Sequence, residues 1–186
     1  MAQAKKLGYR SRAYAKLAQI QQKHQIFTAN MHVLDCGAAP GSWSQVAQEY
    51  ISTGRIVAVD LLKMAPLEGV DFIQGDIEDD HIISQIKSQC PQGLFDVVMT
   101  DIAPNTCGIQ QTDQIRQLAI VESIIAILPE LLKPSGYFIA KVFQGVGHDD
   151  ALKLTRGQFE KVSIMKPSAS RKESKEVYWI AKNFAG

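Results

Sequence analysis

Four charged residues are of types that can hold, orient or move a proton. Lys141 interrupts the apolar stretch Tyr137–Phe143, and a lysine is costly to bury unless it is paired or functional. Asp101 begins the turn that follows another apolar stretch, Glu176 begins the last one, and Lys16 lies in a basic segment near the N-terminus. A neutral lysine can act as a base, and a charged one can orient an oxygen. The two carboxylates favour the charged lysine, so the sequence leaves both roles open.

A short glycine-bearing turn, Gly37–Gly41, follows the buried stretch His32–Cys36 and precedes a helix that begins near Ser42. Such a turn lets the backbone approach a ligand, and the helix N-terminus adds free N–H groups. The turn lacks the G-x-G-x-x-G pattern of dinucleotide sites, and Pro40 removes one N–H donor. These features favour a nucleoside ligand with an amino-acid moiety over one with a pyrophosphate.

Three acidic residues, Asp35, Asp60 and Asp76, end or follow successive apolar stretches. In a parallel sheet these positions share the carboxyl edge, where ligands bind. Asp60 lies 23 residues after Gly37, close to the spacing of a ribose-binding acid, and Asp76 would reach an adenine amino group. Asp at a strand end also caps helices and starts turns, but three in register with the glycine turn favour a cofactor site. S-adenosylmethionine fits this set, since its sulfonium prefers acidic surroundings.

The pattern of apolar residues predicts an α/β fold with a mostly parallel sheet, an antiparallel edge and helices on both faces. Ser11 is a plausible N-cap of the first helix, and Lys133–Gly136 has the composition of a turn. The expected strands are His32–Cys36, Arg55–Asp60, Val70–Gly75, Phe95–Thr100, Tyr137–Phe143, Phe159–Met165 and Glu176–Lys182. The expected helices are Arg10–Phe27, Ser42–Ile51, Asp79–Ser88, Thr112–Leu132 and Asp149–Gly157. The 186 residues are expected to form a single domain, with residues 1–30 as a basic helical segment.

Charge divides the chain into basic ends and an acidic middle. Residues 1–34 have a net charge of +6, residues 35–150 of −10 and residues 151–186 of +5. If the two ends meet in space, they form a positive surface suited to RNA, although charge runs are usually solvated helix faces. The candidate RNA contacts are Lys5, Lys6, Arg12, Arg171, Lys172 and Lys175.

Other features limit the compartment and the cofactors. Three cysteines without metal or redox spacing are expected to be free thiols in a reducing compartment, and the scattered histidines predict no metal site. The chain has no apolar run long enough to cross a bilayer. We expect a cytoplasmic monomer without a membrane partner, and the acid-poor N-terminus leaves a mitochondrial alternative open.

Five segments in this order resemble the FtsJ/RrmJ family of ribose 2′-O-methyltransferases: Ser11–Leu17, Gly37–Trp43, Asp101–Asn105, Lys141–Gly145 and Ser170–Tyr178. The resemblance covers nearly the whole chain and implies a Rossmann-like methyltransferase fold of seven strands. It implies a Lys-Asp-Lys-Glu catalytic tetrad at Lys16, Asp101, Lys141 and Glu176. It also implies cofactor contacts at Gly41, Trp43, Asp60, Asp76 and Asp101, with Ser42 in place of a common second glycine. For Trp43 the backbone is expected to matter more than the indole, and Tyr178 is expected to be a core residue.

The end of the chain is similar to the branch of this family that methylates a uridine of large-subunit ribosomal RNA in the assembled subunit. A transfer RNA or messenger RNA cap ribose methyltransferase is the alternative enzyme. A non-catalytic RNA-binding factor for ribosome assembly is the alternative from another class. A nicotinamide-dependent oxidoreductase is a more distant possibility.

Overall fold

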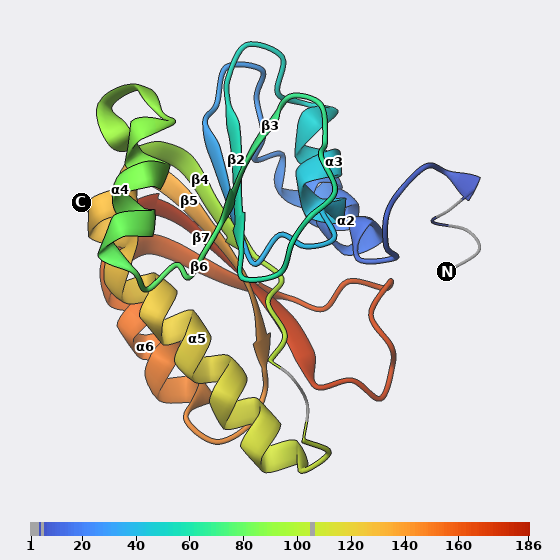
Figure 1. The fold of residues 1–186 in the computed structure, drawn as a ribbon. Coiled ribbons are helices and arrows are strands. Elements are labelled where there is room, and N and C mark those ends of the chain that lie inside the picture. The colour runs from blue at the N-terminus through green and yellow to red at the C-terminus, as the bar shows by residue number, and fades with distance from the viewer. Residues whose placement is uncertain (1–3, 5, 105–106) are drawn as a thin grey trace.

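Seven strands form one sheet in the order β3-β2-β1-β4-β5-β7-β6 (Figure 1). The computed structural model describes residue 4, residues 6–104 and residues 107–186. The strands are β1 Val33–Cys36, β2 Ile56–Asp60, β3 Val70–Gln74, β4 Phe95–Thr100, β5 Leu132–Phe143, β6 Phe159–Met165 and β7 Glu176–Phe184. The first five pair with one another in parallel, and β7 is antiparallel to both β5 and β6. This confirms the predicted mixed sheet. The edge strand is β6, and β7 lies between it and β5.

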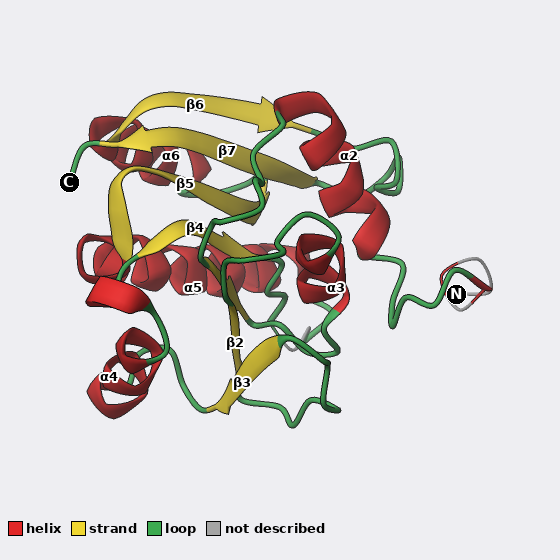
Figure 2. Ribbon diagram, turned by 90° about the horizontal axis from the view of Figure 1, so that it is seen from above, coloured by secondary structure: helices red, strands yellow, loops and turns green. Residues whose placement is uncertain are grey.

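Helices cover both faces of the sheet, as the alternation of strands and helices predicts. They are α2 Tyr14–His24, α3 Ser42–Gln48, α4 Asp80–Ser88, α5 Gln110–Leu131 and α6 His148–Gln158, with a 3₁₀ turn, η1, at Pro91–Gly93. Helices α4, α5 and α6 lie on one face, and α2 and α3 lie on the other (Figure 1). In Figure 2, α2 lies beside the ends of β6 and β7.

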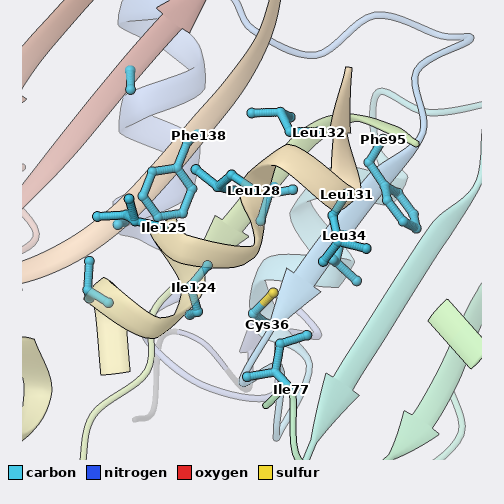
Figure 3. Close-up of a cluster of buried hydrophobic side chains, with 14 of the residues drawn as sticks. Leu34, Cys36, Ile77, Phe95, Ile124, Ile125, Leu128, Leu131, Leu132 and Phe138 are labelled. Atoms are coloured by element: carbon cyan, nitrogen blue, oxygen red, sulfur yellow. The ribbon is translucent and has the colours of Figure 1, made fainter. Parts of the chain in front are cut away.

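The larger core lies between the sheet and α4, α5 and α6. Because side chains alternate between the faces of a strand, Leu34 and Cys36 of β1 point to this side. They pack with Ile124 and Leu128 of α5 and with Phe138 of β5 (Figure 3). This apolar layer fixes the strands relative to one another, and with them the strand ends.

The other face contains the charged residues of interest. Ile139 of β5 and Ile180 of β7 belong to its apolar cluster, together with Leu17 of α2. Lys141 and Tyr178 are cross-strand partners and lie on this same face by alternation. The neighbouring strands therefore present a lysine and a tyrosine beneath the helix that carries Lys16.

Two local predictions were wrong. Ser11 does not cap α2, because the helix begins after Ala13 and the Ser11 hydroxyl instead accepts the backbone N–H of Ala13. Lys133–Gly136 is not a separate turn, because β5 already begins at Leu132. The pairing with β4 shifts between Phe95 and Val97, so these residues form an irregularity within the strand.

Two findings concern the described part of the chain. It contains no helix long and apolar enough to cross a membrane. Nor do its His, Cys, Asp and Glu side chains form a group of three or more that could hold a metal ion.

Candidate active site

A cavity of about 680 Å³ opens at the carboxyl ends of β1, β2 and β4. The glycine turn forms one wall, and Lys141 lies among the lining residues. Gly37 has φ of +72° and closely faces Ile102, so a Cβ there would stand 1.8 Å from an Ile102 carbon. Only glycine fits this close approach. Of the predicted cofactor residues, those lining the cavity are Asp35, Gly37, Trp43, Asp60, Asp76 and Asp101.

The carboxylates of Asp60 and Asp76 are held by backbone N–H groups. Asp60 accepts from Ala39 at 2.8 Å and from Leu62 at 2.7 Å, one bond for each oxygen. Asp76 accepts from Glu78 at 3.0 Å. An ionised carboxylate has about four acceptor sites, so both side chains keep capacity for the hydroxyl or amino groups of a ligand.

Asp35 differs from these two because it is buried at the base of the cavity. Its carboxylate accepts the Ser44 hydroxyl of α3 at 2.7 Å. Burial, assisted by the negative charges of Asp101 and Asp60, raises the pKa of Asp35 to about 7 and outweighs the Ser44 hydrogen bond. Burial thus makes the charged form of Asp35 costly, and a positive charge placed nearby would favour that form.

Lys141 and Asp101 form a closely contacting pair. The Lys141 ammonium donates to the Asp101 carbonyl at 2.6 Å and lies 3.3 Å from the Asp101 carboxylate. The Lys141 side chain is 6% exposed, so this pairing offsets the cost of burying its charge. An ammonium has three donors, and these two acceptors leave one for another group.

Lys16 and Glu176 form the second pair, with 2.7 Å between Nζ and Oε1. Burial acts to raise the pKa of Glu176, but the hydrogen bond from Lys16 and the positive charges of Lys16 and Lys141 outweigh it and lower the pKa. Glu176 is therefore held charged by the two lysines near it. The four predicted tetrad residues come together as two ion pairs.

Tyr178 connects the two pairs, a role that was not foreseen from the sequence. It is buried, as expected, but its hydroxyl donates to Asp101 at 2.8 Å and its ring lies 5.8 Å from the Lys16 ammonium. Burial, followed by the charges of Asp101 and Glu176, raises the pKa of Tyr178 and keeps the hydroxyl a donor. Its position two residues after Glu176 on the same strand face was the available signal.

A second cavity, of about 440 Å³, adjoins the first. It is lined by Ser11, Arg12, Ala13, Lys16 and Arg171. The basic ends of the chain therefore meet in space, as proposed for a positive surface. Lys6, Lys172 and Lys175 are exposed, and Lys5 lies outside the described residues.

Gly41 does not line the larger cavity. It has φ of +105° and precedes α3, and a Cβ there would lie 2.9 Å from the Met64 sulfur and 3.1 Å from an Arg10 nitrogen. The glycine therefore gives room to the Met64 and Arg10 side chains. The Trp43 indole packs at 5.8 Å from the Tyr178 ring and donates to the Ala13 carbonyl at 3.1 Å.

Comparison with known proteins gives consistent results. The model of the family described as FtsJ-like methyltransferase matches residues 9–184. Ribosomal RNA large subunit methyltransferase E of Cellvibrio japonicus is 48% identical over 96% of this chain and 85% of its own length. The protein of the same name from Francisella tularensis subspecies novicida is 45% identical over 99% of this chain and 90% of its own. The crystal structure of a ribosomal RNA methyltransferase from Plasmodium falciparum superposes with a TM-score of 0.85 at 28% identity, covering 96% of this chain and 100% of that one.

Proposed function

Because the chain belongs to the FtsJ-like methyltransferase family and is an S-adenosylmethionine-dependent methyltransferase, we propose that it methylates a ribose 2′-oxygen in large-subunit ribosomal RNA. The acceptor is a uridine of the assembled subunit. The observation that carries this proposal is the position of Lys141, which lines the acidic cavity and lies beside the pair formed by Lys16 and Glu176. The names of the two bacterial relatives support the large subunit as the substrate.

The larger cavity suits the methyl donor. S-adenosylmethionine supplies an electrophilic methyl group on a sulfonium centre when it is bound. Asp60 and Asp76 have free acceptor capacity for its ribose and adenine groups, and Asp35 offers a carboxylate to its positive charge. Because Gly37 has no side chain and packs closely against Ile102, the turn presents its backbone to the cavity at this position.

The reaction needs alignment and the removal of one proton. The ribose 2′-oxygen forms a bond to the methyl carbon while the bond from that carbon to sulfur breaks, the sulfur leaves as a neutral thioether, and the hydroxyl proton passes to solvent water. Lys141 uses its remaining N–H to orient the 2′-oxygen and to stabilise the negative charge that develops as the proton leaves. Asp101 and Tyr178 hold Lys141 in place, and Lys16 with Glu176 lines the acceptor side.

RNA reaches the site across the smaller cavity. Arg12 and Arg171 come from opposite ends of the chain and meet there with Lys16. Guanidinium groups bind phosphates through two parallel hydrogen bonds, so they suit the RNA backbone on both sides of the target ribose. We place this activity in the cytoplasm, where ribosomal subunits assemble, with the protein acting as a monomer.

The test offers labelled S-adenosylmethionine to three acceptors: large ribosomal subunits from cells lacking this enzyme, naked ribosomal RNA, and transfer RNA. Label on one uridine 2′-oxygen of the subunit is the expected result. Label confined to transfer RNA would overturn the substrate assignment. If the protein binds the subunit and the methyl donor but no label transfers, it is a non-catalytic assembly factor.

A further inference from the structure

Arg10 is a basic residue of the N-terminal segment that the proposed reaction does not use. Its guanidinium donates to three backbone carbonyls, those of Pro40 at 3.0 Å, Ala65 at 2.7 Å and Pro66 at 2.7 Å. Pro40 belongs to the glycine turn, and the other two belong to the loop between β2 and β3. One side chain therefore joins the two loops that follow β1 and β2.

The backbone of the same segment is held to α3. The Arg10 N–H donates to the Gln45 side chain at 2.9 Å, and the Gln45 amide donates to the Gly8 carbonyl at 3.0 Å. Gly41 leaves the space in which the guanidinium lies, since a Cβ would stand 3.1 Å from it. Lysine has no planar fork and would not span both loops, so the site is specific for arginine.

The residues after Arg10 form a wall shared by the two cavities. Ser11 and Ala13 line both of them, whereas Arg12 and Lys16 line the smaller one. The Ser42 hydroxyl donates to Ser11 at 2.8 Å, which attaches the wall to the start of α3. The same short segment thus borders the cavity for the methyl donor and the cavity for the acceptor.

We propose that Arg10 is a positioning residue that makes binding of the methyl donor and binding of RNA mutually dependent. A donor that orders the loops after β1 and β2 also orders residues 11–13 through the Arg10 hydrogen bonds, and RNA bound to this wall acts back on the loops. Thermodynamic linkage requires the effect to be equal in both directions. This inference rests on the proposed RNA acceptor and adds a coupling between its two binding sites.

The experiment measures the affinity of S-adenosylhomocysteine, which binds without turnover, by calorimetry with and without saturating unmethylated large subunits. In the wild type the subunits are expected to tighten binding about tenfold, within the usual range of allosteric coupling. In Arg10→Met the tightening is expected to fall below about twofold. Arg10→Lys is expected to restore little of it, because an ammonium keeps the charge but lacks the planar guanidinium that joins the two loops.

Two controls separate coupling from other effects. Lys23→Met removes a positive charge from the last turn of α2, and it is expected to keep the full coupling. Arg12→Ala is expected to weaken subunit binding but to keep the coupling once subunits saturate. If Arg10→Met does not fold, as judged by its melting curve, Arg10→Lys carries the test.

Equal tightening in the wild type and in the folded Arg10 variant would overturn the proposal. So would a wild-type enzyme that methylates the subunit yet shows no coupling. Failure of the proposed function looks different, because then the wild type transfers no methyl group to the subunit at all.

Discussion

Burying any one of the charged side chains in this site costs free energy, and pairing with an opposite charge offsets that cost. Lys141 and Glu176 lie beside the apolar cluster on their face of the sheet, and each is stable there because a partner of opposite charge contacts it. Removing one member of such a pair leaves an uncompensated charge, so effects on activity and on stability must be measured separately.

Lys141→Ala is expected to reduce methylation by at least about 100-fold, the scale of a missing acid–base or orienting group. Affinity for S-adenosylmethionine is expected to change little, because the role proposed for this residue is at the acceptor oxygen. Single-turnover kinetics and calorimetry check the two parts. Full turnover by the folded variant would contradict the assignment.

Lys141→Arg separates the two roles of this lysine. Arginine keeps a positive charge but does not act as a base. Activity above that of the alanine variant supports the orienting role, and activity equal to it supports a basic lysine.

Asp35 makes the free energy of unfolding depend on pH, and the direction follows from its raised pKa. The folded protein raises this pKa to about 7, above the ordinary value of 3.8, so the native state binds the proton more tightly than the unfolded state. The stability contributed by Asp35 is therefore present at low pH and is lost as the pH rises towards 7. Relative to Asp35→Asn, the wild type is expected to lose about 1.4 kcal/mol per pH unit between about pH 5 and pH 7. Urea unfolding of both proteins at several pH values tests this, and parallel curves would refute it.

Among the elements, the loop from β6 to β7 carries the C-terminal part of the basic surface. The Lys166 ammonium donates to the carbonyls of Lys172 at 3.1 Å and Ser174 at 2.6 Å, which closes the loop on itself. Gln19 of α2 donates to the Ser168 hydroxyl at 2.9 Å and accepts from the Ala169 N–H at 3.2 Å. Lys166 thus shapes the loop rather than only adding charge, and Gln19 sets its distance from α2.

Lys166→Met is expected to weaken subunit binding about fivefold, since hydrogen bonds of this kind contribute about 1 kcal/mol. Lys161→Met removes the same charge from an exposed position on β6 and is the matched control. Filter binding measures both variants. Equal losses of affinity would show that charge alone matters, and the loop geometry would then have no special role.

For the whole molecule, the division of charge has a spatial meaning. The ends of the chain, with net charges of +6 and +5, meet at the smaller cavity, whereas the middle, at −10, supplies the acidic residues that line the larger cavity. The protein therefore presents an acidic cavity to a cation beside a basic surface for a polyanion.

The double variant Arg12→Ala, Arg171→Ala is expected to lower RNA affinity and to reduce the salt dependence of binding. The log–log slope should fall by about 0.7–0.9 for each phosphate that the protein no longer neutralises. Lys153→Ala, on α6 at the opposite face, is the control and is expected to keep the wild-type slope. Binding titrations at several salt concentrations give the slopes. An unchanged slope in the double variant would mean that these arginines are solvated surface.

Local patterns in the sequence were sufficient for the order of the strands and helices along the chain and for the acidic residues at the strand ends. Each depends on side-chain alternation, helical spacing or turn composition over a few residues. The glycine turn was equally readable, although the role of Gly41 in giving space to Arg10 was not, because the two residues lie far apart along the chain. The start of β5 at Leu132 also escaped prediction, since its pairing with β4 overrides the turn composition of the following residues.

The four tetrad residues show the same difference between what local patterns predict and what long-range contacts decide. Its four residues were named through resemblance and residue type, but their arrangement as two ion pairs joined by Tyr178 depends on β7 lying beside β5 and on α2 covering that face. Contacts between distant segments likewise place β7 between β5 and β6. Such contacts also form the wall of Ser11 and Ala13 that the two cavities share, and they anchor that wall through Arg10. Strand order and helix packing decide these contacts, and neither is encoded in any single local pattern.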